Sequence, residues 1–129
     1  MSDINVQLHF QDGFTGTLTA RSVQTGIGHG GFRPYEFLLG ALGSCYYSTF
    51  LSILDKMRLS YREATLDITG QKREEVPQHL KAGHIVFTLS GVEDEDKARR
   101  AADLAAKYCS VYYTLSQVAE LSVELKFLP

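Results

Sequence analysis

The feature that most constrains this chain is a run of 18 residues, Phe37 to Leu54, without a charged side chain. A run of that length is at the threshold for a membrane-spanning helix. Small and hydroxyl-bearing residues interrupt it, at Gly40, Gly43, Ser44, Ser48, Thr49 and Ser52. No second run of this kind follows, and a helix that is apolar nearly all round is also typical of a protein core. We therefore predict a long buried central helix, beginning near Pro34, and no membrane span.

Length and charge predict an ordinary globular protein. The 129 residues fit a single domain, 1–129, and 44% of them are hydrophobic. The net charge is −2 and the basic residues are scattered, which argues against a nucleic-acid partner or a membrane surface. The segment Met1–Asn5 has neither the basic nor the apolar region of a secretory signal. We therefore expect a cytoplasmic protein whose two cysteines are free thiols.

The cysteines and histidines are too scattered to predict a metal site. Cys45 and Cys109 are 64 positions apart, which excludes a CxxC motif, and the four histidines lie far from both. Because no close Cys/His pair exists, we expect no zinc, and we predict no other cofactor.

Alternation of apolar and polar residues predicts the strands. It covers 4–10, where it is typical of a half-buried strand, and 121–127; the segments 14–20, 64–73 and 82–90 are also predicted to be strands. Four glycines predict a mobile loop before the central helix, at Gly26, Gly28, Gly30 and Gly31. Acidic residues at 93–96 predict the start of a second helix, with a further helical stretch at about 111–119. The order ββ–α–ββ–α–β predicts an α+β fold.

Small side chains recur every four residues along the central helix, at Gly40, Ser44, Ser48 and Ser52. Residues four apart lie on one face of a helix, so these residues form a stripe. A stripe of small residues lets another backbone approach closely. Its neighbour is either a second copy of the helix or the chain's own sheet.

The two cysteines are candidates for thiol chemistry, although a cysteine in a helix is often a small core residue. The reactive form is the thiolate, and a free cysteine is only slightly ionised at neutral pH. Cys45 lies roughly 16 Å beyond Pro34 along a helix, where the helix dipole no longer stabilises an anion. A reactive Cys45 therefore needs a cation.

Arg33 and Arg21 are the nearest candidates for that cation on the N-terminal side of Cys45. Glu36 could orient either guanidinium through a bidentate pair. Two simpler roles remain open, because Glu36 can stabilise the start of the helix and Arg33 can be a solvated loop residue.

The segment from Arg33 to Cys45, RPYEFLLGALGSC, resembles the first cysteine motif of the OsmC/Ohr family. In that motif Pro, any residue and Glu precede an apolar helix that carries a cysteine. The segment Tyr108-Cys109-Ser110-Val111 resembles the second cysteine motif, with Ser110 where many members have proline. The order of elements fits the family over nearly the whole chain.

The resemblance implies an OsmC-like fold with antiparallel sheets and an intertwined homodimer with two sites at the subunit interface. It implies that Cys45 attacks a hydroperoxide and becomes a sulfenic acid, which Cys109 resolves as a disulfide. Glu36 corresponds to the glutamate that holds a catalytic arginine, and Arg33 is our candidate for that arginine. Better-known members supply it from the N-terminal strands, whereas residues 9–20 here contain none. The chain resembles an OsmC-like branch more than a typical Ohr protein.

The favoured prediction is a cysteine-based peroxidase that reduces organic hydroperoxides through Cys45 and Cys109, with an unidentified dithiol as reductant. Aromatic residues of the central helix suit either an apolar substrate site or the core, at Phe37, Tyr46, Tyr47 and Phe50. One alternative is a non-enzymatic OsmC-like dimer that binds a small apolar ligand. The other is a cysteine-based redox sensor that forms its disulfide without steady turnover.

Overall fold

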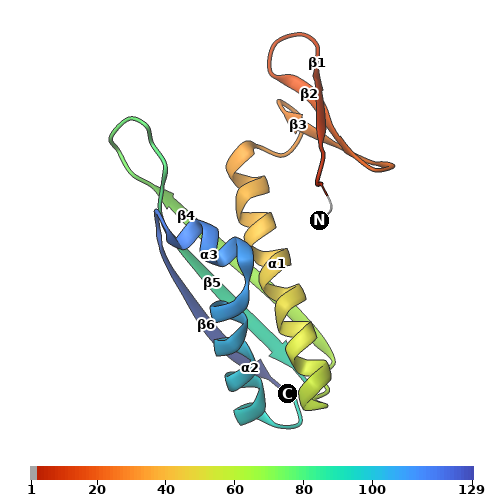
Figure 1. The fold of residues 1–129 in the computed structure, drawn as a ribbon, viewed down its shortest axis with the longest axis vertical. Helices are drawn as coiled ribbons and strands as arrows, with labels where there is room; N and C mark the ends of the chain where they lie inside the picture. Colours follow the sequence, from red (N-terminus) through yellow and green to blue (C-terminus); the bar gives the residue numbers. More distant parts are fainter. Residues whose placement is uncertain (1–2) are drawn as a thin grey trace. The chain divides into compact units, whose positions relative to one another are not determined.

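The computed structural model describes residues 3–129, so the first two residues of the predicted domain lie outside it. The chain forms two compact units, one up to Leu38 and the other from Leu39 to Pro129. Six strands and three helices follow in the order β1 (Gln7–Phe10), β2 (Thr15–Ala20), β3 (Val23–Gly28), α1 (Pro34–Met57), β4 (Glu63–Lys72), β5 (Leu80–Ser90), α2 (Glu95–Tyr108), α3 (Ser110–Ser116) and β6 (Glu120–Leu128). Figure 1 shows these elements coloured along the sequence.

The N-terminal unit contains an antiparallel sheet in the order β1-β2-β3. The prediction of a glycine-rich loop is wrong for its first half, because β3 is a strand that pairs with β2 along its length. Glycines allow close backbone approach here: a Cβ atom on Gly28 would lie 2.1 Å from the carbonyl oxygen of Phe14, and one on Gly31, just after the strand, 2.3 Å from the carbonyl carbon of Gly26. Gly28 also has a φ of 91°, which favours glycine.

The predicted half-burial of the first strand is also wrong. β1 begins at Gln7 and not at residue 4, and all four of its residues are exposed. Leu8 and Phe10 keep 45% and 42% of their surface accessible, respectively. The alternation is real, but no layer within the described chain buries its apolar side chains.

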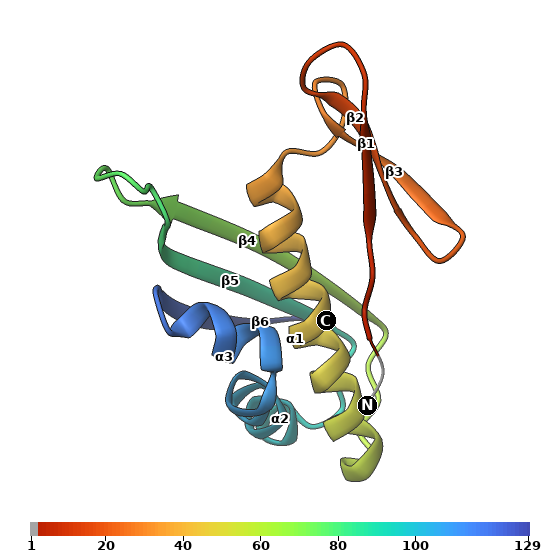
Figure 2. The same ribbon diagram turned by 45° about the horizontal axis from the view of Figure 1, so that its top comes forward.

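The C-terminal unit is a mixed sheet with helices on one face. β4 pairs with β5 antiparallel, and β5 pairs with β6 parallel. A parallel pair needs a crossover connection, which α2 and α3 provide between β5 and β6. Figure 2 shows α1, α2 and α3 on the same side of this sheet. The predicted α+β class is confirmed, but the expectation of antiparallel sheets is wrong for this sheet, because β6 returns parallel to β5.

One face of α1 forms the centre of the core. Its buried side chains recur every four residues, at Leu42, Tyr46, Phe50 and Leu54. From the sheet, inward-facing Ile85, Phe87 and Leu89 complete this layer. The helix is long and apolar enough to cross a membrane by length and composition. Its buried stripe shows that it serves here as the core helix of a folded domain.

The stripe of small residues lies on the other face of α1. Gly40, Ser44, Ser48 and Ser52 are all exposed, so they do not contact the chain's own sheet. Gly43 makes that contact instead: a Cβ atom there would lie 2.3 Å from Cδ1 of Ile68. Of the two neighbours that the sequence allowed for the stripe, the sheet is therefore excluded.

Candidate thiol site

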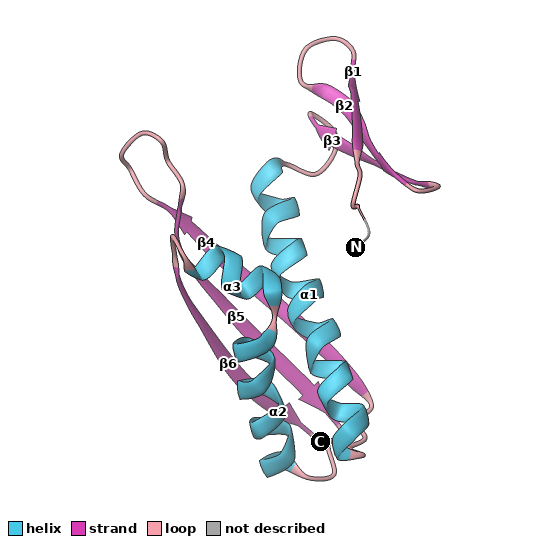
Figure 3. Cartoon of the chain, viewed as in Figure 1, coloured by secondary structure: helices cyan, strands magenta, loops and turns pink. Residues whose placement is uncertain are grey.

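Cys45 and Cys109 come from different helices of the C-terminal unit. Cys45 lies in the middle of α1 and is half-buried, whereas Cys109 is only 1% exposed. Cys109 separates α2 from α3 because its backbone is extended, with φ −70° and ψ 120°. Figure 3 shows this short break between the two helices. Both residues are free thiols in the structure.

The break creates backbone donors at the start of α3. The first N–H groups of a helix have no acceptor within the helix. Tyr112 donates its N–H to Sγ of Cys109 at 3.4 Å, so the cysteine sulfur caps the helix. The N–H groups of Ser110 and Val111 donate to Cys45. The backbone N–H groups in the first turn of α3 therefore donate hydrogen bonds to both sulfur atoms.

The two thiols also contact each other. Cys109 and Cys45 form a side-chain hydrogen bond, although they are far apart in sequence. Oγ of Ser110 lies 3.8 Å from Sγ of Cys45, which adds a hydroxyl to the same sulfur. The structure thus brings Cys45 and Cys109 close together, as the resolving step implied by the family resemblance requires.

The surroundings shift the pKa values of the two thiols in opposite directions. Burial raises the pKa of Cys45, but hydrogen bonds from Val111, Cys109 and Ser110 outweigh it, and the net pKa lies below the ordinary value. Burial raises the pKa of Cys109, and its hydrogen bond to Cys45 raises it further. Cys45 therefore ionises first, while Cys109 keeps its proton and donates it to the Cys45 sulfur.

The lowered pKa of Cys45 has a consequence for stability. Because the folded pKa is below the unfolded one, the ionised thiol stabilises the fold at pH values above the unfolded pKa. That contribution is lost as the pH falls through the folded pKa of Cys45.

Glu36 and Arg33 form a helix cap in the N-terminal unit. The backbone N–H of Arg33 donates to Oε1 of Glu36 at 2.8 Å. This is the reciprocal half of a capping box, in which a glutamate in the first turn accepts from the residue before the helix. Across residues 3–129, no ion pair joins Glu36 to a guanidinium. The structure thus shows the simpler role for Glu36, and catalytic roles for Glu36 and Arg33 remain predictions.

Of the aromatic residues suggested for a substrate site, Tyr46 and Phe50 belong to the core, whereas Phe37 and Tyr47 are half-buried. Tyr46 and Phe50 are completely buried, and both rings pack edge-to-face against Phe87, with centroids 5.6 and 4.7 Å away. The hydroxyl of Tyr46 donates to the carbonyl of Ala102 in α2 at 2.9 Å. Tyr46 thereby ties α1 to α2 next to Cys45, which holds the two cysteine-bearing segments in register.

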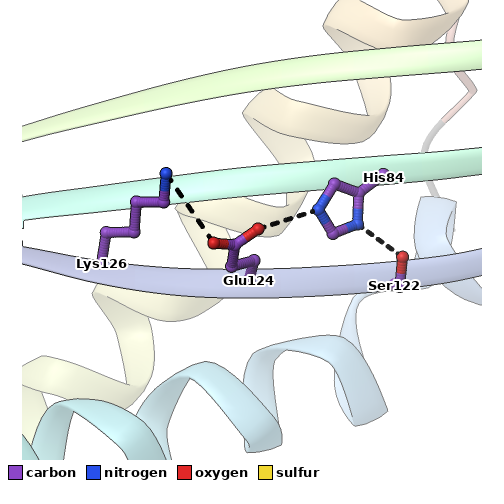
Figure 4. Close-up of polar contacts among 4 residues, drawn as sticks. All are labelled: His84, Ser122, Glu124 and Lys126. Carbon is purple, nitrogen blue, oxygen red and sulfur yellow. Dashed lines mark hydrogen bonds and ion pairs between the residues drawn. The ribbon is translucent and has the colours of Figure 1, made fainter.

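A second polar cluster lies on the sheet face opposite the helices (Figure 4). His84 contacts Oγ of Ser122 through Nδ1 at 2.6 Å and Oε1 of Glu124 through Nε2 at 3.3 Å. Nζ of Lys126 lies 3.7 Å from the other oxygen of Glu124. These side chains are about half exposed, so their ion pairs contribute little stability. The cluster lacks the water-excluded surroundings that a serine–histidine–acid catalytic site uses.

Sequence reasoning missed the donors that surround Cys45. The side-chain types suggested a cation, whereas the donors are the backbone N–H groups of Ser110 and Val111. One signal was present, since the second helix ends near Cys109 and a further helical stretch follows directly. A new helix starting beside a cysteine implies free N–H groups at that point. Over the part of the chain that the structure describes, no group of three or more His, Cys, Asp or Glu could hold a metal ion.

The OsmC-like protein family model matches residues 27–124, which include both cysteines and the whole C-terminal unit up to β6. The chain belongs to the OsmC-like family. This confirms the resemblance inferred from the two cysteine motifs. The matched region also contains Glu36 and Arg33.

Individual relatives agree with this OsmC-like membership. Escherichia coli protein YhfA is 34% identical over 91 residues, which are 69% of this chain and 68% of YhfA. A hypothetical protein from Aquifex aeolicus superposes with a TM-score of 0.85 at 26% identity over all of both chains. An organic hydroperoxide resistance protein from Elizabethkingia anophelis superposes with a TM-score of 0.76 at 13% identity, over 99% of this chain and 98% of that one. The last likeness shows a shared fold.

Proposed function

We propose that this OsmC-like protein is a thiol peroxidase that reduces organic hydroperoxides, with Cys45 as the attacking thiol and Cys109 as the resolving thiol. The observation that carries the proposal is the contact between the two thiols together with their opposite pKa shifts. A peroxidatic cysteine must be ionised and accessible, and a resolving cysteine can be protonated and buried. Cys45 has the lowered pKa and is partly accessible, whereas Cys109 has the raised pKa and is buried.

The first step oxidises Cys45. Its thiolate attacks the terminal oxygen of the hydroperoxide, an S–O bond forms and the O–O bond breaks. The sulfur becomes a sulfenic acid, which keeps the hydroperoxide's proton on its oxygen. The alkoxide leaves with the bonding electrons and takes a proton from water to become the alcohol. The peroxide is thereby reduced by two electrons.

The second step joins the two cysteines in a disulfide. The sulfur of Cys109 attacks the sulfenic sulfur of Cys45, an S–S bond forms and the S–O bond breaks. The departing hydroxide combines with the proton from Cys109 and leaves as water. An external dithiol then reduces the disulfide by thiol exchange and is itself oxidised to a disulfide.

Fold relatives named for organic hydroperoxide resistance support this choice of substrate class. Such proteins from Legionella pneumophila and Elizabethkingia anophelis each superpose over at least 98% of this chain. The free thiols of Cys45 and Cys109 also fit the reducing cytoplasm that we expect for the protein.

The proposal is tested by following the consumption of cumene hydroperoxide with dithiothreitol as reductant. We expect steady turnover by the wild type and none by Cys45→Ser. Cys109→Ser should retain slower turnover, because a small dithiol can reduce the sulfenic acid directly. Ser116→Ala, a change at an exposed serine whose hydroxyl donates to the carbonyl of Tyr113, is the control and should match the wild type.

The same assay separates the alternatives. A redox sensor forms the Cys45–Cys109 disulfide with stoichiometric peroxide but shows little steady turnover. A non-enzymatic binding protein forms no disulfide at a rate above that of free cysteine. Either result would contradict the peroxidase proposal.

We further propose that the protein acts as an intertwined homodimer. Two surfaces that a monomer would normally cover are exposed in the single chain. They are the small-residue stripe of α1 and the apolar side chains Leu8 and Phe10 of β1. The hydroxyls of Ser44 and Ser52 donate to carbonyls of their own helix, so they need no water and can pack against a partner. An obligate interface should bury more than about 2,000 Å².

A further inference from the structure

We propose that Ser110 is a catalytic residue of the thiol site, whose hydroxyl and backbone N–H together hold the Cys45 thiolate. This inference rests on the proposed function, because it assigns a donor to the sulfur that attacks the hydroperoxide. It also changes where the charge stabilisation comes from. The donors are neutral groups of α3 and not a guanidinium.

The hydroxyl of Ser110 can act on the ionised sulfur in one direction only. Its Oγ lies 3.8 Å from Sγ of Cys45, and either atom can donate while Cys45 carries a proton. Once Cys45 is ionised it has no proton, so Ser110 must donate. Hydrogen bonds to an ionised group are stronger than those between neutral groups. The contact therefore favours the thiolate over the thiol.

The backbone of Ser110 supplies a second donor to the same atom. Ser110 is the first residue of α3, so its N–H has no acceptor within the helix. This N–H donates to Cys45, alongside that of Val111. One residue thus makes two hydrogen bonds to the reacting sulfur, and their joint effect is consistent with the lowered pKa of Cys45.

Ser110 can be replaced by proline without disturbing the backbone. Proline is favoured at the first position of a helix, where its missing N–H breaks no helical bond. The residue before a proline must be extended, and Cys109 already has φ −70° and ψ 120°. Ser110→Pro should therefore fold normally while removing both donors. Ser110→Ala removes the hydroxyl alone.

The test measures the alkylation of Cys45 by iodoacetamide against pH, with the modified peptide quantified by mass spectrometry. At neutral pH we expect Ser110→Pro to be alkylated about tenfold more slowly than wild type and Ser110→Ala about threefold more slowly. In both variants the midpoint of the pH profile should move upward. The rate at high pH should not fall, because every thiol is then ionised. Ser110→Thr keeps both donors and should stay close to the wild type.

The matched control is Ser44→Ala, which removes a hydroxyl next to Cys45 in sequence. That hydroxyl donates to the carbonyl of Ala41 and not to the sulfur. A wild-type midpoint in Ser110→Pro, or an equal shift in Ser44→Ala, would overturn the inference. No peroxide is used, so a shifted midpoint in a protein without turnover would refute the proposed peroxidase activity and leave this role of Ser110 intact.

Discussion

Strands β1 of the N-terminal sheet and β5 of the C-terminal sheet both alternate apolar and polar residues, but only β5 buries its apolar side chains. Leu8 and Phe10 of β1 are almost half exposed, whereas Ile85 and Phe87 of β5 keep at most 1% of their surface accessible. The difference comes from the helices, because α1, α2 and α3 all cover one face of the C-terminal sheet (Figure 2). Alternation therefore predicts which residues share a face, and the neighbouring layer decides whether that face is buried.

The proposed thiol chemistry also belongs to one of the two units. Both thiols, the donors of α3 and the aromatic residues that fix α1 lie in the C-terminal unit. The N-terminal unit contributes the exposed apolar side chains of β1, which we propose that a second copy of the chain covers. Substitutions in the two units should accordingly have different effects.

The largest difference is expected between Phe87→Ala and Phe10→Ala. Phe87 is fully buried against Tyr46 and Phe50, so its truncation should lower the free energy of unfolding by about 3–5 kcal/mol. Phe10→Ala should lower the free energy of unfolding by less. Its effect should grow with protein concentration, because a second copy of the chain covers the Phe10 side chain in the proposed dimer. Urea denaturation at two protein concentrations measures both. Equal costs that do not depend on concentration would remove the distinction between the two sheets.

The exposed stripe of α1 provides the next test. Ser48→Arg places a charge at the centre of the proposed interface and should weaken the dimer by about 3 kcal/mol, since that charge would be buried without a partner. Thr65→Arg, on the exposed face of β4, is the matched control and should leave the dimer intact. Sedimentation equilibrium at micromolar concentration reads out both. A wild-type protein that sediments only as a monomer would refute the proposed homodimer.

Two glycines of α1 sharpen the comparison further. Gly43→Ala should destabilise the protein by about 1–3 kcal/mol, because the new methyl group meets Ile68 of the sheet. Gly40→Ala meets no atom of its own chain within 4 Å, and its better helix propensity should raise the free energy of unfolding by up to about 1 kcal/mol. Thermal unfolding of dilute protein measures the stability of both variants. The account of the two helix faces fails if Gly40→Ala is the more damaging change.

The smallest effect is expected from an arginine of the N-terminal unit. The pKa of Cys45 is lowered by hydrogen bonds from residues of the C-terminal unit, so Arg33→Ala should change the alkylation midpoint of Cys45 very little. Arg21→Ala should behave in the same way, since Arg21 occupies the β2–β3 turn with φ 58°. The alkylation assay used for Ser110 applies directly. A midpoint shift as large as that of Ser110→Pro would place a guanidinium in the thiol site after all.

Much of the fold was predictable because local patterns determine it. The long apolar run predicted α1, the acidic segment at 93–96 predicted the start of α2, and the strands predicted at 64–73, 82–90 and 121–127 match β4, β5 and β6 within two residues. β3 was missed because its glycines suggested a loop, whereas Gly28 is required by the close approach of the Phe14 carbonyl oxygen. Such an approach depends on pairing between segments, which one segment's composition does not reveal.

The site was predictable in part for a similar reason. The paired motifs identified Cys45 and Cys109, and the structure brings these two residues together. The source of thiolate stabilisation was not predictable from side-chain types, because much of it comes from backbone N–H groups that every sequence contains. Glu36 was expected to hold an arginine side chain, but its carboxylate accepts from the Arg33 backbone. Backbone donors become visible only once the helix boundaries are known.

The most direct test of the peroxidase account is to add one equivalent of cumene hydroperoxide to the reduced protein and map its cysteines by mass spectrometry. We predict an intrachain disulfide between Cys45 and Cys109 in the wild type. In Cys109→Ser the reaction should stop at a sulfenic acid on Cys45, captured by dimedone. A protein that consumes the hydroperoxide with Cys45 still reduced, or that forms the sulfenic acid on Cys109, would contradict the account.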